Sequence, residues 1–121
     1  MNICIIGDGL TSLSLAKNLI DKKINVYFYY QNKTKNSVSS RTIGISRHNL
    51  EFFRKKIHKI PKRFFWEIKK IEIYSEKLEK ENLLSFENDK DKLFYILKND
   101  LLYKSLIKNI SKNKFFKRNL I

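Results

Sequence analysis

The sequence predicts an α/β fold in which a strand–helix–strand unit contributes a parallel sheet and a small antiparallel hairpin follows further along the chain. Three patterns predict it. A short apolar run at residues 3–6 is followed by a glycine turn, a helical repeat and a second apolar run at 24–30. Apolar and polar residues alternate within 68–75, before another apolar stretch at 83–88. A second helical repeat at 100–112 precedes a final strand-like run.

The first run, Ile3–Ile6, is short, uncharged and rich in β-branched residues. This composition is typical of a strand that is buried on both faces of a parallel sheet. We therefore expect a buried, unreactive thiol at Cys4, the single cysteine of the chain. From Leu10 onwards apolar residues recur with helical spacing, which predicts a helix over residues 10–22. The two strands that flank this helix are expected to be parallel neighbours.

Two of the three glycines in the chain, Gly7 and Gly9, lie in the turn between the first strand and the helix. In a dinucleotide-binding loop the first glycine permits a sharp turn, and the second lets the backbone approach a pyrophosphate. The helix N-terminus then presents N–H groups and its positive dipole end to the anion. The motif here reads G-x-G-x-x-S, with Ser12 at the third position. The residues alone leave two interpretations open, a phosphate-binding loop or an ordinary turn.

The end of the second strand departs from the dinucleotide-binding pattern, in which an Asp or Glu about 20 residues further on binds the ribose hydroxyls. The usual spacing leads to Tyr30, and no acid lies between Lys23 and Arg47. A phenol can form one hydrogen bond or stack on adenine, but it cannot bind the diol as a carboxylate does. We therefore place Tyr30 at the ribose or adenine edge of a nucleotide site.

The segment after the second strand, "SRTIGIS" (40–46), resembles one in the flavin-dependent aromatic hydroxylases of ubiquinone biosynthesis, within the p-hydroxybenzoate-hydroxylase-like superfamily. In that family an arginine begins a short element that returns the chain toward the flavin, and a helix follows at once. Arg41 matches this arginine, and Ser46 is well placed to cap the helix. That helix is expected over 47–58, with an apolar face formed by Leu50, Phe53, Ile57 and Ile60.

Three later segments extend the resemblance in the order of the family. "IKKIEIYS" (68–75) and "LLSFEN" (83–88) resemble its hairpin, and "YILKNDLLYKSL" (95–106) resembles its "YVVENRxLRRAL", which leads into a crossover helix. Asn99 or Asp100 is expected to cap that helix, and "KFFKRNLI" is expected to begin the next strand of the sheet. Together these segments favour the flavin interpretation of the glycine loop. The fold implied is a Rossmann-like FAD-binding unit that is incomplete relative to the family.

The resemblance implies an FAD-dependent monooxygenase. In the family, NAD(P)H reduces FAD, and O2 provides the oxygen that hydroxylates an aromatic ring, here a prenylated phenol that is a ubiquinone precursor. Because the flavin carries the chemistry, no side chain of this chain is expected to act as acid, base or nucleophile. No metal ligands are expected either. The residues expected to bind the cofactor are Gly7, Gly9, Leu10, Ser12, Tyr30, Arg41 and Lys98.

The resemblance spans all 121 residues as the N-terminal portion of an FAD-binding domain. Its parts are a βαβ unit (1–30), a loop and helix (41–66), a hairpin (68–88), and a crossover helix with the start of the next strand (95–121). Since members of the family are much longer, we expect a truncated gene product, an incomplete reading frame or one piece of a split enzyme. The remainder of the enzyme or a partner chain is then needed to complete the fold. An inactive remnant is the alternative.

The net charge of +14 invites a nucleic-acid interpretation. The excess of positive charge, however, comes from 21 lysines against five arginines. The sequence is also rich in Ile and Asn, and Lys, Ile and Asn all have AT-rich codons. The lysines are scattered, as on a solvated surface. We therefore expect no specific nucleic-acid partner, and a small basic protein that binds nucleic acid or a membrane surface is the less favoured alternative. Without a signal peptide or a run of about 18 apolar residues, the chain is expected to be cytoplasmic, with peripheral association with the inner membrane as an option.

Overall fold

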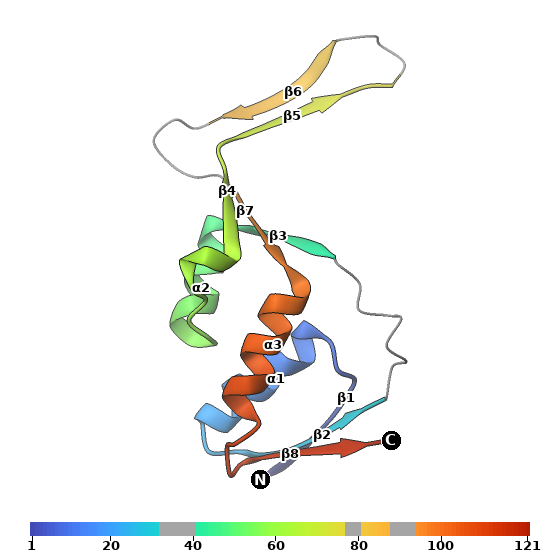
Figure 1. Cartoon of the computed structure of the whole chain (residues 1–121), viewed down its shortest axis with the longest axis vertical. Coiled ribbons are helices and arrows are strands. Elements are labelled where there is room, and N and C mark those ends of the chain that lie inside the picture. The colour runs from blue at the N-terminus through green and yellow to red at the C-terminus, as the bar shows by residue number, and fades with distance from the viewer. Residues whose placement is uncertain (32–40, 77–80, 88–93) are drawn as a thin grey trace.

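A computed structural model gives the fold of the chain and describes residues 1–31, 41–76, 81–87 and 94–121. Along the long axis of Figure 1 a parallel sheet, a second sheet and a hairpin follow one another, with helices packed on the two sheets. In chain order the elements are β1 (Asn2–Ile6), α1 (Leu10–Asp21), β2 (Asn25–Tyr30), β3 (Thr42–Ser46), α2 (Arg47–Lys56), a 3-10 turn (Lys62–Phe64), β4 (Phe65–Ile68), β5 (Lys70–Tyr74), β6 (Asn82–Glu87), β7 (Phe94–Lys98), α3 (Asn99–Ile110) and β8 (Phe116–Leu120).

The parallel sheet has the strand order β1-β2-β8, so β2 lies in the middle. Ile3 pairs with Val26 and Ile5 with Phe28, in parallel orientation. On the other side of β2, Phe28 pairs with Arg118 in the parallel strand β8. The prediction that the first two strands are parallel neighbours is therefore confirmed. The segment "KFFKRNLI" forms the next strand of the sheet, as expected.

The core lies between this sheet and helices α1 and α3, which cover the same face of the sheet (Figure 1). Val26 and Phe28 of the central strand are fully buried there. Both helices present the apolar stripe that the helical repeat predicts, and burying each leucine or isoleucine of it stabilises the fold by about 1.5–3 kcal/mol. The buried helix residues are Leu13, Ala16 and Ile20 of α1 and Leu102, Leu106 and Ile110 of α3.

The first strand is buried on one face only, which corrects the expectation for Cys4. Side chains alternate between the two faces of a strand, and the helices cover only the face that Ile5 occupies. Cys4 is exposed on the other face, and Ile6 is 76% exposed. A thiol in this position is accessible to reagents, so the prediction of a buried, unreactive cysteine is wrong.

The segments at 41–66 and 95–98 form part of a second sheet, which the sequence does not predict. It is antiparallel, with the order β3-β7-β4. Thr42 pairs with Lys98 at one end of β3, and Trp66 pairs with Ile96 on the other side of β7. The predicted loop and helix at 41–66 therefore contain strand β3 and the start of β4 as well as α2.

The two predicted helix caps differ in outcome. The Ser46 hydroxyl accepts a hydrogen bond from the Asn49 N–H at 3.2 Å, so the predicted cap of α2 is confirmed. Leu50 on the predicted apolar face of α2 is buried. In contrast, α3 begins after Lys98, which makes no side-chain capping bond. Neither Asn99 nor Asp100 is the N-cap of α3, because strand β7 runs directly into this helix and both residues already belong to it.

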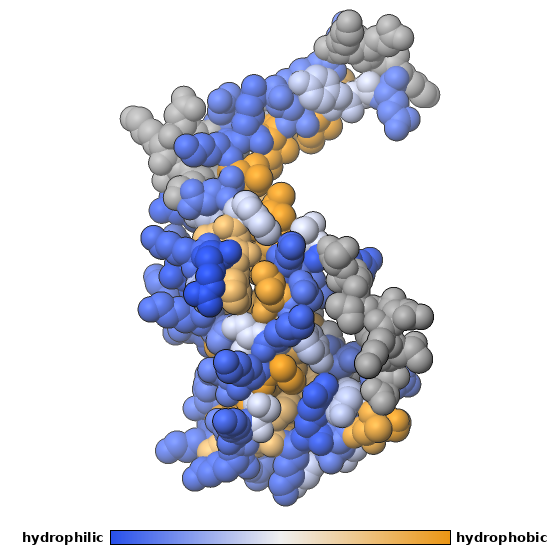
Figure 2. Space-filling view, viewed as in Figure 1, coloured by the Kyte–Doolittle hydropathy of each residue, from blue (hydrophilic) through white to orange (hydrophobic). Residues whose placement is uncertain are grey.

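The predicted antiparallel hairpin is confirmed as β5 paired with β6. Lys70 pairs with Glu87 at its base, and an irregularity lies at Ile73 and Tyr74. The hairpin projects beyond the second sheet (Figure 1). Figure 2 shows apolar residues on the side of the hairpin that faces the rest of the chain.

Candidate nucleotide-binding site

The first glycine of the loop is required by the fold itself. Gly7 follows β1 with a φ of +111°, a backbone conformation that side-chain-bearing residues rarely adopt. Its N–H donates to the carbonyl of Tyr29 at 2.9 Å, which ties the loop to the end of β2. The Ser12 hydroxyl lies 3.7 Å from the place that a Cβ on Gly7 would take. The small Ser12 at the third motif position thus lets α1 sit close to the turn.

The second glycine is not required by the fold. Gly9 has an extended backbone with φ −76° and ψ 170°, which any residue can adopt, and a Cβ built on it meets no atom within 4 Å. Gly9 is also the N-cap of α1, whose start has no side-chain capping bond and no acid in its first turn. Open space therefore lies over the amino end of a 12-residue helix, where backbone N–H groups and the helix dipole favour an anion. This end of the site fits a pyrophosphate.

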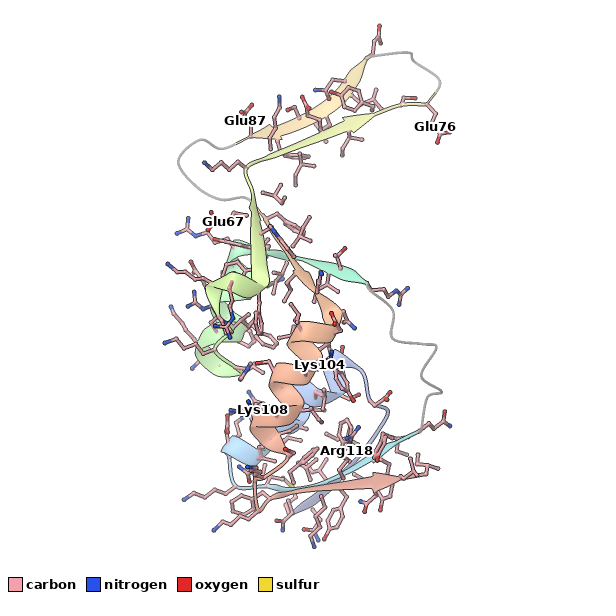
Figure 3. The ribbon with its side chains drawn as sticks, viewed as in Figure 1. Glu67, Glu76, Glu87, Lys104, Lys108 and Arg118 are labelled. Carbon is pink, nitrogen blue, oxygen red and sulfur yellow. The ribbon has the colours of Figure 1, made fainter. Side chains whose placement is uncertain are left out.

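The end of β2 carries an aromatic–cation pair in place of the usual carboxylate. The Tyr30 ring is half-buried, and the guanidinium carbon of Arg118 lies 3.8 Å from its centroid. Figure 3 shows Arg118 on β8, next to the central strand. The Tyr30 carbonyl also accepts a hydrogen bond from the Ile121 N–H at 2.9 Å. Sequence reasoning located Tyr30 but missed Arg118, although an arginine in the run expected to begin the next strand of the sheet was a usable signal.

Arg41 and Lys98 are brought together by the second sheet. The Asn99 N–H donates to the Arg41 carbonyl at 2.8 Å, next to the Thr42–Lys98 pair. Both predicted side chains are exposed. Their contribution to a phosphate site stays a prediction.

Residues of α1 and β3 line the same apolar hollow, which has a volume of about 280 Å³. Strand β3 therefore lies beside the first turn of α1. Thr11 and Ser14 of α1 line the hollow together with Ile43 and Ile45 of β3. The strand that Arg41 precedes therefore runs close to the motif helix.

A second polar pair lies away from this loop. The ring Nε2 of His58 and the hydroxyl of Ser105 on α3 are 2.7 Å apart. Burial, and then the charge of Lys17, lower the pKa of His58, which favours the neutral imidazole. Lys17 lies in the second half of α1, so this pair is not part of the glycine-loop site. Among the described residues, no group of three or more His, Cys, Asp or Glu could hold a metal ion. None of the helices in that part of the chain has the length and apolar character to cross a membrane.

The fold recurs in solved structures of monooxygenases. No protein-family model and no curated protein matches the sequence. The chain is similar in structure to p-nitrophenol 4-monooxygenase from Pseudomonas putida DLL-E4, with a TM-score of 0.76 and 11% identity over 98% of this chain and 32% of that one. It is also similar to 2,6-dihydroxypyridine-3-hydroxylase from Arthrobacter nicotinovorans (TM-score 0.67, 16% identity, 97% and 28% covered). A putative FAD-containing monooxygenase from Photorhabdus luminescens gives a TM-score of 0.65 and 19% identity, with 98% and 30% covered.

The chain shares its fold with these monooxygenases and also with a geranylgeranyl bacteriochlorophyll reductase-like protein from Thermoplasma acidophilum (TM-score 0.74, 17% identity, 98% and 29% covered). At these identities the likeness concerns the fold, and the predicted Rossmann-like α/β architecture is confirmed. The chain spans about a third of the length of the structures it matches, at 32%, 28% and 30%. The geometry thus divides the predicted site residues into two groups. Gly7, Gly9, Leu10, Ser12 and Tyr30 meet at one edge of the parallel sheet, whereas Arg41 and Lys98 belong to the neighbouring sheet.

Proposed function

We propose that this chain is the FAD-binding, N-terminal part of a monooxygenase that hydroxylates an aromatic ring. The observation that carries the proposal is the open space over Gly9 at the amino end of α1. An ordinary turn accepts a side chain at such an extended position. The absence of a side chain at Gly9 is therefore explained by a ligand that occupies the space where that side chain would lie. The fold shared with monooxygenases supports a flavin dinucleotide as that occupant.

The residues of the loop have separate roles in this proposal. Gly7 makes the turn, Gly9 leaves room for the pyrophosphate, and backbone N–H groups of Leu10 and Ser12 donate to it. Arg41 reaches the phosphates with a planar guanidinium that suits them, and Lys98 adds charge beside it. FAD, once bound, supplies the redox chemistry, with NAD(P)H as its reductant. The chain's own residues bind and orient the cofactor and take no proton from the substrate.

The substrate proposed is a prenylated phenol of ubiquinone biosynthesis. It rests on the resemblance of segments 40–46 and 95–106 to hydroxylases of that pathway, and two of the similar structures are named for aromatic substrates. A cytoplasmic enzyme with peripheral contact to the inner membrane fits a prenylated substrate. Because the chain spans about a third of those structures, the remainder of the enzyme completes the substrate site and further flavin contacts.

The proposal is tested by equilibrium dialysis of the chain with FAD and with ADP, at concentrations up to the millimolar range. We expect weak binding of both, because Tyr30 replaces the ribose carboxylate. Gly9→Val should abolish it, since the branched side chain fills the pyrophosphate space. Leu15→Val, on the exposed side of the same helix, is the matched control and should leave binding unchanged. A Gly9→Val protein that binds both ligands like the wild type would show that the loop is only a turn.

Arg41 has its own test in the same assay. Arg41→Ala should weaken ADP binding by about 1.5–3 kcal/mol, the range for a hydrogen bond to a charged group. Arg47→Ala is the control, because Arg47 is exposed and forms an ion pair with Glu51 at 3.1 Å. Tyr30→Glu should leave binding unchanged or strengthen it, since a carboxylate accepts hydrogen bonds from both ribose hydroxyls. Equal losses in Arg41→Ala and Arg47→Ala would assign the effect to net charge and remove Arg41 from the site.

A further inference from the structure

The densest run of positive charge in the sequence lies at the carboxyl end of α2 and in the turn that follows it. Residues 54–63 read "RKKIHKIPKR", with six Lys or Arg in ten positions and no acid. Figure 3 shows nitrogen-bearing side chains around α2. Scattered lysines suit a solvated surface, whereas this run concentrates charge in one place.

The structure gathers four of these cations around one hollow. The hollow has a volume of about 330 Å³, and the second half of α1 and the last turn of α3 bound its other sides. The ring Nε2 of His58 lies 2.7 Å from the Ser105 hydroxyl, which holds the turn after α2 against α3. The four cations that line the hollow are Arg54, Lys55, Lys56 and Lys59.

The chain does not neutralise these four charges. Two acids line this hollow and a smaller one beside it, and both acids are already paired. Asp21 accepts a hydrogen bond from Lys17, and Glu51 accepts one from Arg47 at 3.1 Å. Within the described residues, the four cations have no hydrogen bond or ion pair. The negative end of the α2 dipole is equivalent to only about half an elementary charge, so an anionic partner is needed to balance them.

An exposed aromatic side chain lies on the same face of α2 as two of the lysines. Residues three and four apart are neighbours on a helix surface, so Phe52 adjoins Lys55 and Lys56. Phe52 is 54% exposed, whereas Leu50 on the opposite side of the helix is buried. The charges alone would suit any polyanion. An apolar side chain among the lysines favours a bilayer, because the boundary between headgroups and acyl chains accepts both.

We propose that the surface formed by Phe52, Arg54, Lys55, Lys56 and Lys59 docks the chain on a bilayer that contains anionic phospholipids. Arg54 is half-buried in the wall of the hollow, and its planar guanidinium donates to headgroup phosphates. The exposed lysines add ionic attraction, and Phe52 enters the boundary with the acyl chains. This inference deepens the peripheral membrane contact of the proposed function and rests on that part of it. Its residues are separate from the glycine loop.

Co-sedimentation of the full chain with vesicles tests this surface, using phosphatidylcholine alone or mixed with phosphatidylglycerol. The chain should bind only the anionic vesicles, and binding should weaken as the salt concentration rises. Each Lys or Arg near such a surface contributes about a factor of five in affinity. Replacing two lysines together, Lys55→Gln and Lys56→Gln, should therefore weaken binding about 25-fold. Phe52→Ser should weaken it about tenfold, because an apolar ring no longer leaves water.

The matched control is the double variant Lys114→Gln and Lys117→Gln. It removes the same charge from β8 and the turn before it, which lie apart from α2 (Figure 1). Both lysines are exposed, so this protein should fold and should bind anionic vesicles nearly as well as the wild type. Equal losses in the two double variants would assign binding to net charge and overturn the proposal.

The remaining outcomes also decide the matter. A chain that does not sediment with anionic vesicles, but binds FAD and ADP in dialysis, would overturn this inference and leave the nucleotide site standing. Equal binding to vesicles of phosphatidylcholine alone would show that the cations are not the cause. Tighter binding to double-stranded DNA than to anionic vesicles, with Lys55 and Lys56 required, would assign the surface to nucleic acid instead.

Discussion

Replacing each loop glycine by alanine should separate what the fold requires from what a ligand requires. In Gly7→Ala, the new Cβ meets Ser12 at an ordinary 3.7 Å, so the cost lies in the backbone at φ +111°. Such strain costs about 1–3 kcal/mol, and the reduced entropy of the unfolded chain offsets about 0.4–1 kcal/mol of it. The free energy of unfolding should therefore fall by about 1–2 kcal/mol.

In Gly9→Ala, by contrast, the two effects nearly cancel. The backbone at φ −76° accepts alanine and no atom lies within 4 Å of the new Cβ, so no strain arises. The unfolded-state term stabilises by about 0.4–1 kcal/mol, and the poorer N-cap costs a similar amount. Urea denaturation followed by circular dichroism should place Gly9→Ala within about 0.5 kcal/mol of wild type. A loss at Gly9 as large as the loss at Gly7 would refute the claim that the fold does not need this glycine.

Three further predictions concern residues outside the loop. Gly44→Ala should destabilise the chain by about 1–3 kcal/mol, because its Cβ would clash with Cε1 of Phe94. Phe94→Leu should recover much of the loss in the same urea assay, and equal losses in both backgrounds would contradict the clash. Cys4 should react with a thiol reagent in the folded protein at a rate near that of a free thiol, and reaction only after denaturation would contradict its exposure. Since burial and Lys17 lower the pKa of His58, the unfolded chain binds the proton more readily, and stability should fall as pH drops below the unfolded value of about 6.5. His58→Gln should lose less stability than wild type between pH 7.5 and 5.5, and identical pH profiles would contradict the assignment.

The elements predicted well are those with a clear period or a local cap. The change from an apolar run to a helical repeat identified β1, α1 and β2, and the Ser46 cap of α2 is a contact between residues three apart. The burial of Cys4 was mispredicted because a four-residue apolar run does not say how many faces of the strand are covered. Here α1 and α3 cover only one face of the sheet.

Contacts between distant segments account for the rest. The sheet β3-β7-β4 joins residues more than 50 apart, such as Thr42 and Lys98, and no local pattern encodes that pairing. The same pairing extends β7 up to the first turn of α3, which displaces the predicted cap. The stack of Arg118 on Tyr30 likewise depends on β8 lying beside β2. The residues of the glycine loop are contiguous and Tyr30 follows from the usual spacing, so these candidates could be named from the sequence, whereas the contact of Arg118 with Tyr30 could not.

The most direct test of the account is a two-dimensional amide NMR titration of the 15N-labelled chain with ADP at constant ionic strength. We expect saturable shifts concentrated on the amides of Gly7, Gly9, Leu10 and Ser12, where the pyrophosphate meets the amino end of α1. Shifts spread over the lysine-rich surface, with none at the loop, would mean that the +14 charge alone attracts the nucleotide, and would contradict a built dinucleotide site.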